Sequence, residues 1–505
     1  MSNLEASIRS VSNEEAPRAS YARSASIGML WVAAALGVGK LLSLISQIFL
    51  GHVLSVETYA IFGMASTAVA LTAGFQNPNV GKALIQSATH FPELFIRYSA
   101  FAFQFGLIGS MFLIILGWVF AETYDMPQLC AVLVITGLSV PLLSVNTTLA
   151  AGLSLSYRFR DINTVDIKRS LIYYFALVSI ALLGAEALTM AVAMLIANVA
   201  AHLLLLRQSA LLPSYFKLRP RDFAITLGTL RWVILSSFLA ALAMRSDYFV
   251  LGKMLNMEEM GYYTFAIMLV ASLTLPISTG ITQVFLPIFA RLQGDEQALL
   301  REVQRFSAAI VIIGSVLCLL MLGMNAVLIH LLWGGKWDLT HFVVNALAMA
   351  MPFRFLGMIA GVGLEAIGRW RLRNGLLAFE AVLLSTFAAI GAALGGLNGA
   401  IAGTVVQFVV GSFVGFYFIR RVLCGRVGGA AAMTLRLYAP FVAAGAMLLV
   451  LSPSRHGTGA GPQTLALAAS ETLAALVLFS LLTFLLNRTV LVAALNLVRQ
   501  WIARR

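Results

Sequence analysis

Three basic residues, Lys40, Arg245 and Arg354, interrupt long apolar stretches of the sequence. A charged side chain at membrane depth is costly in free energy and usually faces a water-filled cavity or a partner. Lysine and arginine bind phosphate and carboxylate oxygens, and arginine does so through two parallel hydrogen bonds. The three residues therefore predict a cationic cavity for an anionic ligand. Gln47 shares a helix face with Lys40 and is expected to line the same cavity.

Two acidic residues, Asp247 and Glu380, also lie inside apolar stretches. They are candidates either for binding a coupling ion or for charge pairs with neighbouring helices. Asp247 follows Arg245 by two residues, so the two side chains leave different faces of a helix. The three basic residues could also be structural and bind no ligand. A charge pair between helices satisfies a basic side chain, and so does an extended conformation that reaches the membrane surface. Glu365 is expected to pair with Arg369, four residues later.

The elements that position these side chains are transmembrane helices. Of the 505 residues, 60% are hydrophobic and 11% are charged, whereas soluble domains carry about 25% charged residues. Apolar runs of about 20 residues, each long enough to cross a bilayer, recur along the whole chain. The composition therefore predicts an all-α polytopic membrane protein, and no polar block is large enough to be a soluble domain.

The apolar runs predict about fourteen transmembrane helices. Most of the 34 Lys and Arg residues fall in alternate loops, which the positive-inside rule assigns to the cytoplasm together with both termini. The net charge of +13 has the same origin, so no nucleic-acid partner is expected. Trp333 and Trp337 are expected to form an aromatic anchor at the periplasmic interface. The expected helices are 25–50, 58–76, 99–120, 129–152, 168–184, 187–206, 224–252, 260–290, 306–333, 342–366, 375–395, 398–419, 435–451 and 464–486.

Internal repeats indicate that the helices form two similar bundles. Gln47–Phe62 aligns with Tyr248–Tyr263, and Pro141–Asn163 aligns with Pro352–Asn374. Equivalent helices have the same orientation, so the repeats are parallel, and two bundles that rock about a central cavity form a transporter design. The predicted parts are a disordered cytoplasmic segment 1–24, a six-helix bundle 25–206, a cytoplasmic linker 207–223, a six-helix bundle 224–421, an extra helix pair 435–486 and a cytoplasmic tail 487–505.

No motif for a metal, a cofactor or a nucleotide occurs in the sequence. The three cysteines, Cys130, Cys318 and Cys424, are scattered without the spacing of metal ligands or of a disulfide framework. The pair Gly39-Lys40 lacks the first glycine and the following Ser or Thr of a nucleotide-binding P-loop. We therefore expect no cofactor, no metal and no ATP bound to this chain.

Several stretches carry a family resemblance when they are taken in order along the chain. They read NPNVGKALIQS from Asn77, SYRFRDINTVDIKRSL from Ser156, RSDYFVLGKMLNMEEMGYYTFA from Arg245, EAIGRWRLRN from Glu365 and GLNGAIAGT from Gly396. The chain resembles the polysaccharide transporter family of lipid-linked oligosaccharide flippases, within the multidrug/oligosaccharidyl-lipid/polysaccharide exporter superfamily. One departure is Ala60, where the family usually has glycine; the second repeat keeps it as Gly261.

The resemblance implies a two-lobe bundle like that of the multidrug exporters in the superfamily. It also implies a function, which is to move an undecaprenyl-pyrophosphate-linked oligosaccharide to the periplasmic leaflet of a bacterial inner membrane for exopolysaccharide, capsule or O-antigen synthesis. The expected partners are this glycolipid, membrane lipids, and the polymerase and chain-length proteins of the same pathway. The basic cavity would then receive the pyrophosphate.

Two other functions remain open. A membrane polysaccharide polymerase or ligase has similar hydropathy, but such enzymes typically have a large periplasmic loop for sugar chemistry. The longest predicted periplasmic loop, from Leu451 to about Thr464, is short and carries no pair of carboxylates. A cation-coupled drug exporter of the same superfamily is the second alternative. The ordered stretches favour the oligosaccharide branch, in which the protein is a transporter and not an enzyme.

Overall fold

The computed structural model describes residues 37–78, 80–81, 84, 91–156, 158–209, 211–216, 218–292, 294–424, 430–451 and 462–503. These residues form helices joined by turns, and no strand occurs among them. The prediction of an all-α fold is therefore confirmed. The predicted disordered segment 1–24 and most of the loop after Leu451 lie outside the described residues.

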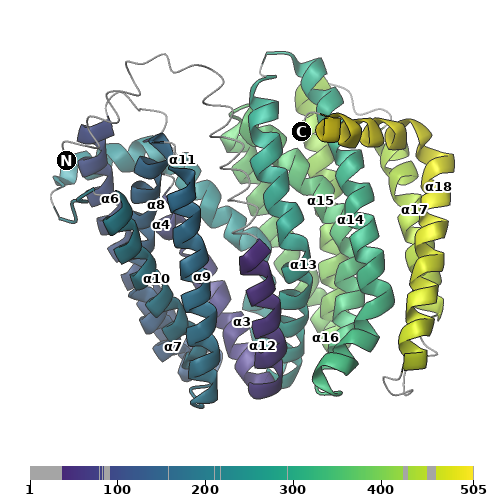
Figure 1. The fold of residues 1–505 in the computed structure, drawn as a ribbon, viewed down its shortest axis with the longest axis horizontal. Helices are drawn as coiled ribbons and strands as arrows, with labels where there is room; N and C mark the ends of the chain where they lie inside the picture. Colours follow the sequence, from purple (N-terminus) through teal and green to yellow (C-terminus); the bar gives the residue numbers. More distant parts are fainter. Residues whose placement is uncertain are drawn as a thin grey trace. The chain divides into compact units, whose positions relative to one another are not determined.

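The chain divides into two compact units, Met1–Arg245 (unit 1) and Ser246–Arg505 (unit 2). This division falls inside the predicted helix 224–252, and the predicted domain boundaries stay predictions. The labelled helices of unit 1 appear from purple to teal in Figure 1. They follow an unlabelled helix Gly37–Val53. They are α3 (Val56–Ala70), α4 (Ala73–Gln76), α6 (Phe91–Thr123), α7 (Gln128–Gly137), α8 (Val140–Leu155), α9 (Phe159–Leu182), α10 (Leu188–Ser209) and α11 (Pro220–Arg245).

Aromatic side chains join the helices of unit 1. Phe101 and Phe105 of α6 stack with their ring centroids 5.3 Å apart, and Phe223 of α11 lies 4.9 Å from Phe101. Phe75 of α4 packs edge-on against Phe238 of α11 at 5.0 Å. These contacts explain why α11 belongs to unit 1, since buried aromatic rings contribute large apolar areas.

The helices of unit 2 run from teal to yellow in Figure 1, and α17 and α18 lie side by side there and pack against α14. The long helix α16 is broken at Gly395 and Gly396, where Gly396 has a φ of 55° that disfavours other residues. The helices are α12 (Asp247–Met254), α13 (Met257–Ala290), α14 (Glu296–Trp333), α15 (Thr340–Ala366), α16 (Trp370–Cys424), α17 (Ala430–Leu451) and α18 (Pro462–Ala503).

Eight helices in the described part of the chain are long and apolar enough to cross a membrane. The predicted helices 375–395 and 398–419 are the two halves of α16, and the predicted helix 224–252 comprises α11 and α12. The prediction of a polytopic helical membrane protein is confirmed. The total of about fourteen spans stays a prediction.

The first pair of aligned repeats folds in the same way in both units. In unit 1 the helix Gly37–Val53 ends where the Leu54 N–H donates to the Leu50 carbonyl at 2.8 Å, and α3 begins two residues later. In unit 2, α12 ends where the Leu255 N–H donates to the Leu251 carbonyl at 2.9 Å, and α13 follows after a turn of equal length. Both leucines after the helix are buried, so each turn is anchored in its own unit.

The second pair of repeats also shares a turn. The Arg158 N–H donates to the Leu153 carbonyl at 2.9 Å between α8 and α9, and the Arg369 N–H donates to the Leu364 carbonyl at 3.1 Å between α15 and α16. The same hydrogen bond closes the last turn of the preceding helix in each case. The internal duplication read from the sequence is therefore present in the backbone.

The expectation of an interfacial anchor at Trp337 is wrong. Its side chain is fully buried in unit 2 and stacks on Phe265 of α13, with ring centroids 3.8 Å apart. Trp333 is 5% exposed and meets the same Phe265 ring edge-on at 5.1 Å. These two tryptophans form part of the core that joins α13 to the α14–α15 turn.

Candidate functional site

Lys40 and Gln47 lie on the helix Gly37–Val53 of unit 1, as predicted from their spacing. Lys40 is partly buried and Gln47 is 7% exposed. The Gln47 Nε2 is buried, and within the described structure it has no hydrogen-bond partner, which leaves a donor that a ligand or water can use. A Cβ on Gly39 would lie 3.7 Å from the Ser170 hydroxyl, so this helix packs closely against α9.

Arg245 and Asp247 occupy the break between α11 and α12. Arg245 is the last residue of α11 and is partly exposed. Asp247 is the first residue of α12 and is 2% exposed. Its Oδ2 accepts a hydrogen bond of 2.5 Å from the Tyr263 hydroxyl, whose oxygen lies 3.5 Å from the Thr404 hydroxyl. The structure therefore gives Asp247 a partner from α13, and its role in ion coupling stays a prediction.

A second polar contact fixes the start of unit 2. The Ser246 hydroxyl donates to the Ala381 carbonyl of α16 at 2.8 Å, and the Ser385 hydroxyl donates to the Ser246 carbonyl at 3.2 Å. Because Ser246 directly precedes Asp247, these bonds also fix the position of the buried Asp247 carboxylate along the axis of α16.

Arg354 lies near the middle of α15, and its guanidinium carbon is 4.6 Å from the centroid of the Phe408 ring in the second half of α16. This is the geometry of a cation–π contact. The charges of Arg373 and Arg354 act on the carboxylate of Glu380, which lies in the first half of α16. Both predicted candidates, Arg354 and Glu380, are thus brought together inside unit 2 in a group that contains both charge signs.

Gly411 makes room for this ionic group. A Cβ there would lie 3.1 Å from the Gln407 amide nitrogen and 3.8 Å from the Glu380 Cγ. Gln407 is 4% exposed, and its Oε1 is a buried oxygen with no hydrogen-bond partner in the described structure. Gln407 was not among the predicted site residues, because a glutamine carries no charge that would stand out in an apolar stretch.

The expected pair of Glu365 with Arg369 is replaced by another. Glu365 Oε1 accepts from the Arg373 Nε at 3.0 Å, and the two side chains are 21% and 14% exposed. The guanidinium of Arg373 lies against Gly361, where a Cβ would come within 2.7 Å of its central carbon. Arg369 instead lies on the exposed turn, because its backbone closes the end of α15.

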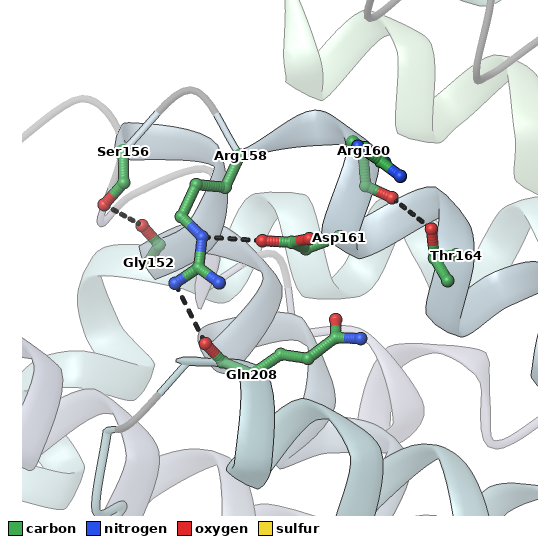
Figure 2. A network of polar contacts seen from close by, with 7 residues as sticks. All are labelled: Gly152, Ser156, Arg158, Arg160, Asp161, Thr164 and Gln208. Carbon is green, nitrogen blue, oxygen red and sulfur yellow. Dashed lines mark hydrogen bonds and ion pairs between the residues drawn. The ribbon is translucent and has the colours of Figure 1, made fainter.

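Figure 2 shows the equivalent turn of unit 1, where Arg158 reaches from the α8–α9 turn to the end of α10. Its Nε lies 2.6 Å from the Asp161 Oδ2, and its Nη1 donates to the Gln208 carbonyl at 2.9 Å. The Arg160 carbonyl accepts a hydrogen bond from the Thr164 hydroxyl at 2.7 Å. Arg158 therefore ties α8, α9 and α10 together, and its basic charge serves the fold of unit 1.

Arg169 is a further ionic residue, and it stands at the second position of the predicted helix 168–184. The predicted helix 168–184 begins at Phe159 in the structure, so Arg169 lies well inside α9. Its Nη1 donates to the Asn198 Oδ1 at 3.2 Å, and Asn198 is near the middle of the apolar helix α10. The spacing of Asp166, Arg169 and Tyr173 at helical intervals could have signalled this polar face.

The described residues contain no group of three or more His, Cys, Asp or Glu side chains that could hold a metal ion. Their ionic groups pair carboxylates with guanidinium or hydroxyl groups. Such groups can bind anions, sugars or a proton.

Comparison with known proteins identifies the fold and the family. The structure of the lipid II flippase MurJ in an inward closed conformation aligns with a TM-score of 0.71 at 12% identity, covering 92% of this chain and all of that one. A multidrug resistance MATE family transporter of the MOP superfamily aligns in its inward-facing conformation with a TM-score of 0.56 at 15% identity, covering 78% and 95%. A MOP superfamily transporter from Pyrococcus furiosus gives 0.56 at 15% identity, covering 81% and 96%.

A comparison with curated protein sequences gives no match. A family model described as polysaccharide biosynthesis protein matches residues 49–341, which is more than half of the chain. The match includes the repeated turns at Leu54 and Leu255 and the whole of α9. This multi-pass membrane protein, whose fold is that of the MOP superfamily transporters, therefore belongs to the polysaccharide biosynthesis protein family.

Proposed function

We propose that this protein flips an undecaprenyl-pyrophosphate-linked oligosaccharide repeat unit to the periplasmic leaflet of a bacterial inner membrane. The match to the polysaccharide biosynthesis family carries this proposal. The similarity to a structure named as a lipid II flippase supports it, because that name describes a lipid-linked cargo. The exported units would serve exopolysaccharide, capsule or O-antigen synthesis.

The two units would move the cargo by alternating access. In this mechanism Lys40, Arg245 and Arg354 bind the pyrophosphate, since cationic side chains at membrane depth favour an anionic head group. Gln47 offers an amide donor without a protein partner among the described residues. Both termini lie in the cytoplasm, where basic loops are retained.

Asp247 and Glu380 would couple this movement to a proton or cation gradient. Asp247 is buried against the Tyr263 hydroxyl, and Glu380 lies in the field of Arg354 and Arg373. A change in the charge of Glu380 would alter how strongly Arg354 is held inside unit 2, and hence how readily it binds a phosphate. The polymerase and chain-length proteins of the same pathway would act on the exported unit.

The decisive experiment is to delete the gene and to analyse lipid-linked glycans in each membrane leaflet. We expect completed repeat units to accumulate in the cytoplasmic leaflet, with loss of the exported polymer. Repeat units that reach the periplasmic leaflet but stay unpolymerised would indicate a polymerase or ligase instead. Drug sensitivity with normal polymer would indicate a drug exporter. Either of these results would overturn the proposal.

A further inference from the structure

The helix α9 of unit 1 carries a polar face at the depth of its apolar neighbour. Asp166, Arg169, Ser170 and Tyr173 follow one another at intervals of three and four residues, so they project from one side of the helix. The charge of Arg169 acts on both the Asp166 carboxylate and the Tyr173 hydroxyl. These four residues are referred to below as the polar face of α9.

The opposite side of α9 is apolar and exposed. Leu171 is 47% exposed, Phe175 is 77% exposed and Leu182 is 66% exposed. Lys168 precedes Leu171 and Phe175 by three and seven residues and shares their side of the helix. At about 100° per residue, this side lies roughly half a turn from the polar face. The apolar side is suited to lipid, so the polar face does not point into lipid.

The polar face lies at membrane depth and not at a helix end. Arg169 donates to Asn198 near the middle of α10, a helix long and apolar enough to cross the membrane. Asp166 and Arg169 nevertheless remain exposed. The long Lys168 side chain on the apolar side can extend to the membrane surface. The short Asp166 carboxylate and the Arg169 guanidinium, which Asn198 holds, cannot do so and need water or a polar ligand at this depth. The polar face therefore borders an aqueous space.

Aromatic and cationic groups complete this surface. Tyr173 is partly exposed and meets Tyr174 edge-on, with ring centroids 5.0 Å apart. The helix Gly37–Val53 packs on α9 at Ser170, where a Cβ on Gly39 would lie 3.7 Å from the serine hydroxyl. Lys40 is the next residue of that helix, so its backbone lies one residue from this contact.

We propose that the polar face of α9 is a binding subsite for the sugar rings of the lipid-linked glycan, an inference that rests on the proposed flippase function. A carboxylate accepts hydrogen bonds from sugar hydroxyls, and a guanidinium and a serine hydroxyl donate them. A tyrosine ring packs against the apolar face of a sugar and offers a hydroxyl at its rim. The polar face of α9 presents these groups on adjacent turns of one rigid helix.

The presence of Asp166 favours sugar over pyrophosphate as the ligand. Its carboxylate repels a phosphate, whereas it binds a hydroxyl pair strongly. The Arg169 guanidinium is already oriented by Asn198, so it is held ready for a neutral or weakly acidic ring. The glycan would therefore contact α9 while the basic candidates receive the pyrophosphate.

The test measures binding of two probes to the purified full-length chain in lipid nanodiscs. One probe is the lipid-linked oligosaccharide isolated from cells that lack the gene, and the other is undecaprenyl pyrophosphate without sugar. We expect Asp166→Asn to weaken glycolipid binding about tenfold and Tyr173→Leu to weaken it about threefold to tenfold. Tyr173→Phe, which keeps the ring, should retain most of the affinity. Binding of undecaprenyl pyrophosphate should change less than twofold.

Matched controls lie on the opposite side of the same helix. Lys168→Gln and Phe175→Leu should leave the affinity for both probes unchanged, and thermal midpoints check that every variant folds. The inference is overturned if Asp166→Asn and Tyr173→Leu weaken both probes equally or neither, or if Lys168→Gln weakens glycolipid binding as much. A native chain that binds only undecaprenyl pyrophosphate also overturns it but leaves flipping intact. A native chain that binds neither probe removes the proposed function as well.

Discussion

A close backbone approach in unit 2 predicts a large effect from a single methyl group. The two halves of α16 touch at Gly391 and Gly399, where a Cβ on Gly399 would lie 2.0 Å from the Gly391 carbonyl oxygen. Ordinary contacts of a Cβ begin at about 3.4 Å, so Gly399→Ala must push the two halves apart by more than about 1 Å. Overpacking of this kind costs about 1–3 kcal/mol. The upper end applies here because the clashing atom is backbone and cannot rotate away.

The assay is thermal unfolding of the purified protein in detergent, followed by intrinsic fluorescence. Gly399→Ala should lower the midpoint by about 3–10 °C. Gly375→Ala is the matched control, because it is the same substitution in the same helix and its Cβ would have nothing within 4 Å. It should leave the midpoint unchanged or raise it, since alanine is favoured over glycine in a helix by about 0.5–1 kcal/mol. Equal midpoints for the two variants would refute the close approach of the helix halves.

Three further predictions concern buried groups of unit 2. Trp337→Ala should cost about 3–5 kcal/mol because the indole is fully buried, and a normal thermal midpoint would contradict its place in the core. Glu365→Gln and Arg373→Gln should show a coupling energy of about 1 kcal/mol in a double-mutant cycle, and additive effects would mean that the 3.0 Å pair adds no stability. Asp247→Asn should cost about 1.5–3 kcal/mol by weakening its hydrogen bond with Tyr263, and the loss should disappear in a Tyr263→Phe background.

The fold was predictable because it depends on patterns that a sequence displays directly. Apolar length gives helices, and the turns after Leu50 and Leu251 carry matching residues that fold alike in both units. The break at Ser246 was not predictable, since neither proline nor glycine marks it. It depends instead on hydrogen bonds with Ala381 and Ser385, far along the chain.

The site was less predictable than the fold. A hydropathy profile falls at every charged residue, so a charge inside a helix is mistaken for the end of that helix. This placed Lys168 and Arg169 at the start of the predicted helix 168–184, whereas in the structure α9 begins at Phe159 and contains both well after its start. Helical periodicity would have separated Arg169, on the polar face, from Lys168 on the lipid side. The prediction of an interfacial anchor at Trp337 was wrong for a different reason. Nearby glycines suggest a surface turn, and only tertiary packing on Phe265 buries the ring.

The aligned repeats carry opposite charges at one equivalent position. Continuing the alignment of Pro141–Asn163 with Pro352–Asn374 places Arg169 of unit 1 opposite Glu380 of unit 2. Each lies on the helix after the shared turn and has a carboxamide in its surroundings: Arg169 binds Asn198, and Gln407 lies with Glu380 beside Gly411. The same backbone therefore forms around a cation in one unit and an anion in the other. We expect the opposite signs at this level to match what each unit binds, so substitutions there should alter cargo or ion recognition before they alter stability.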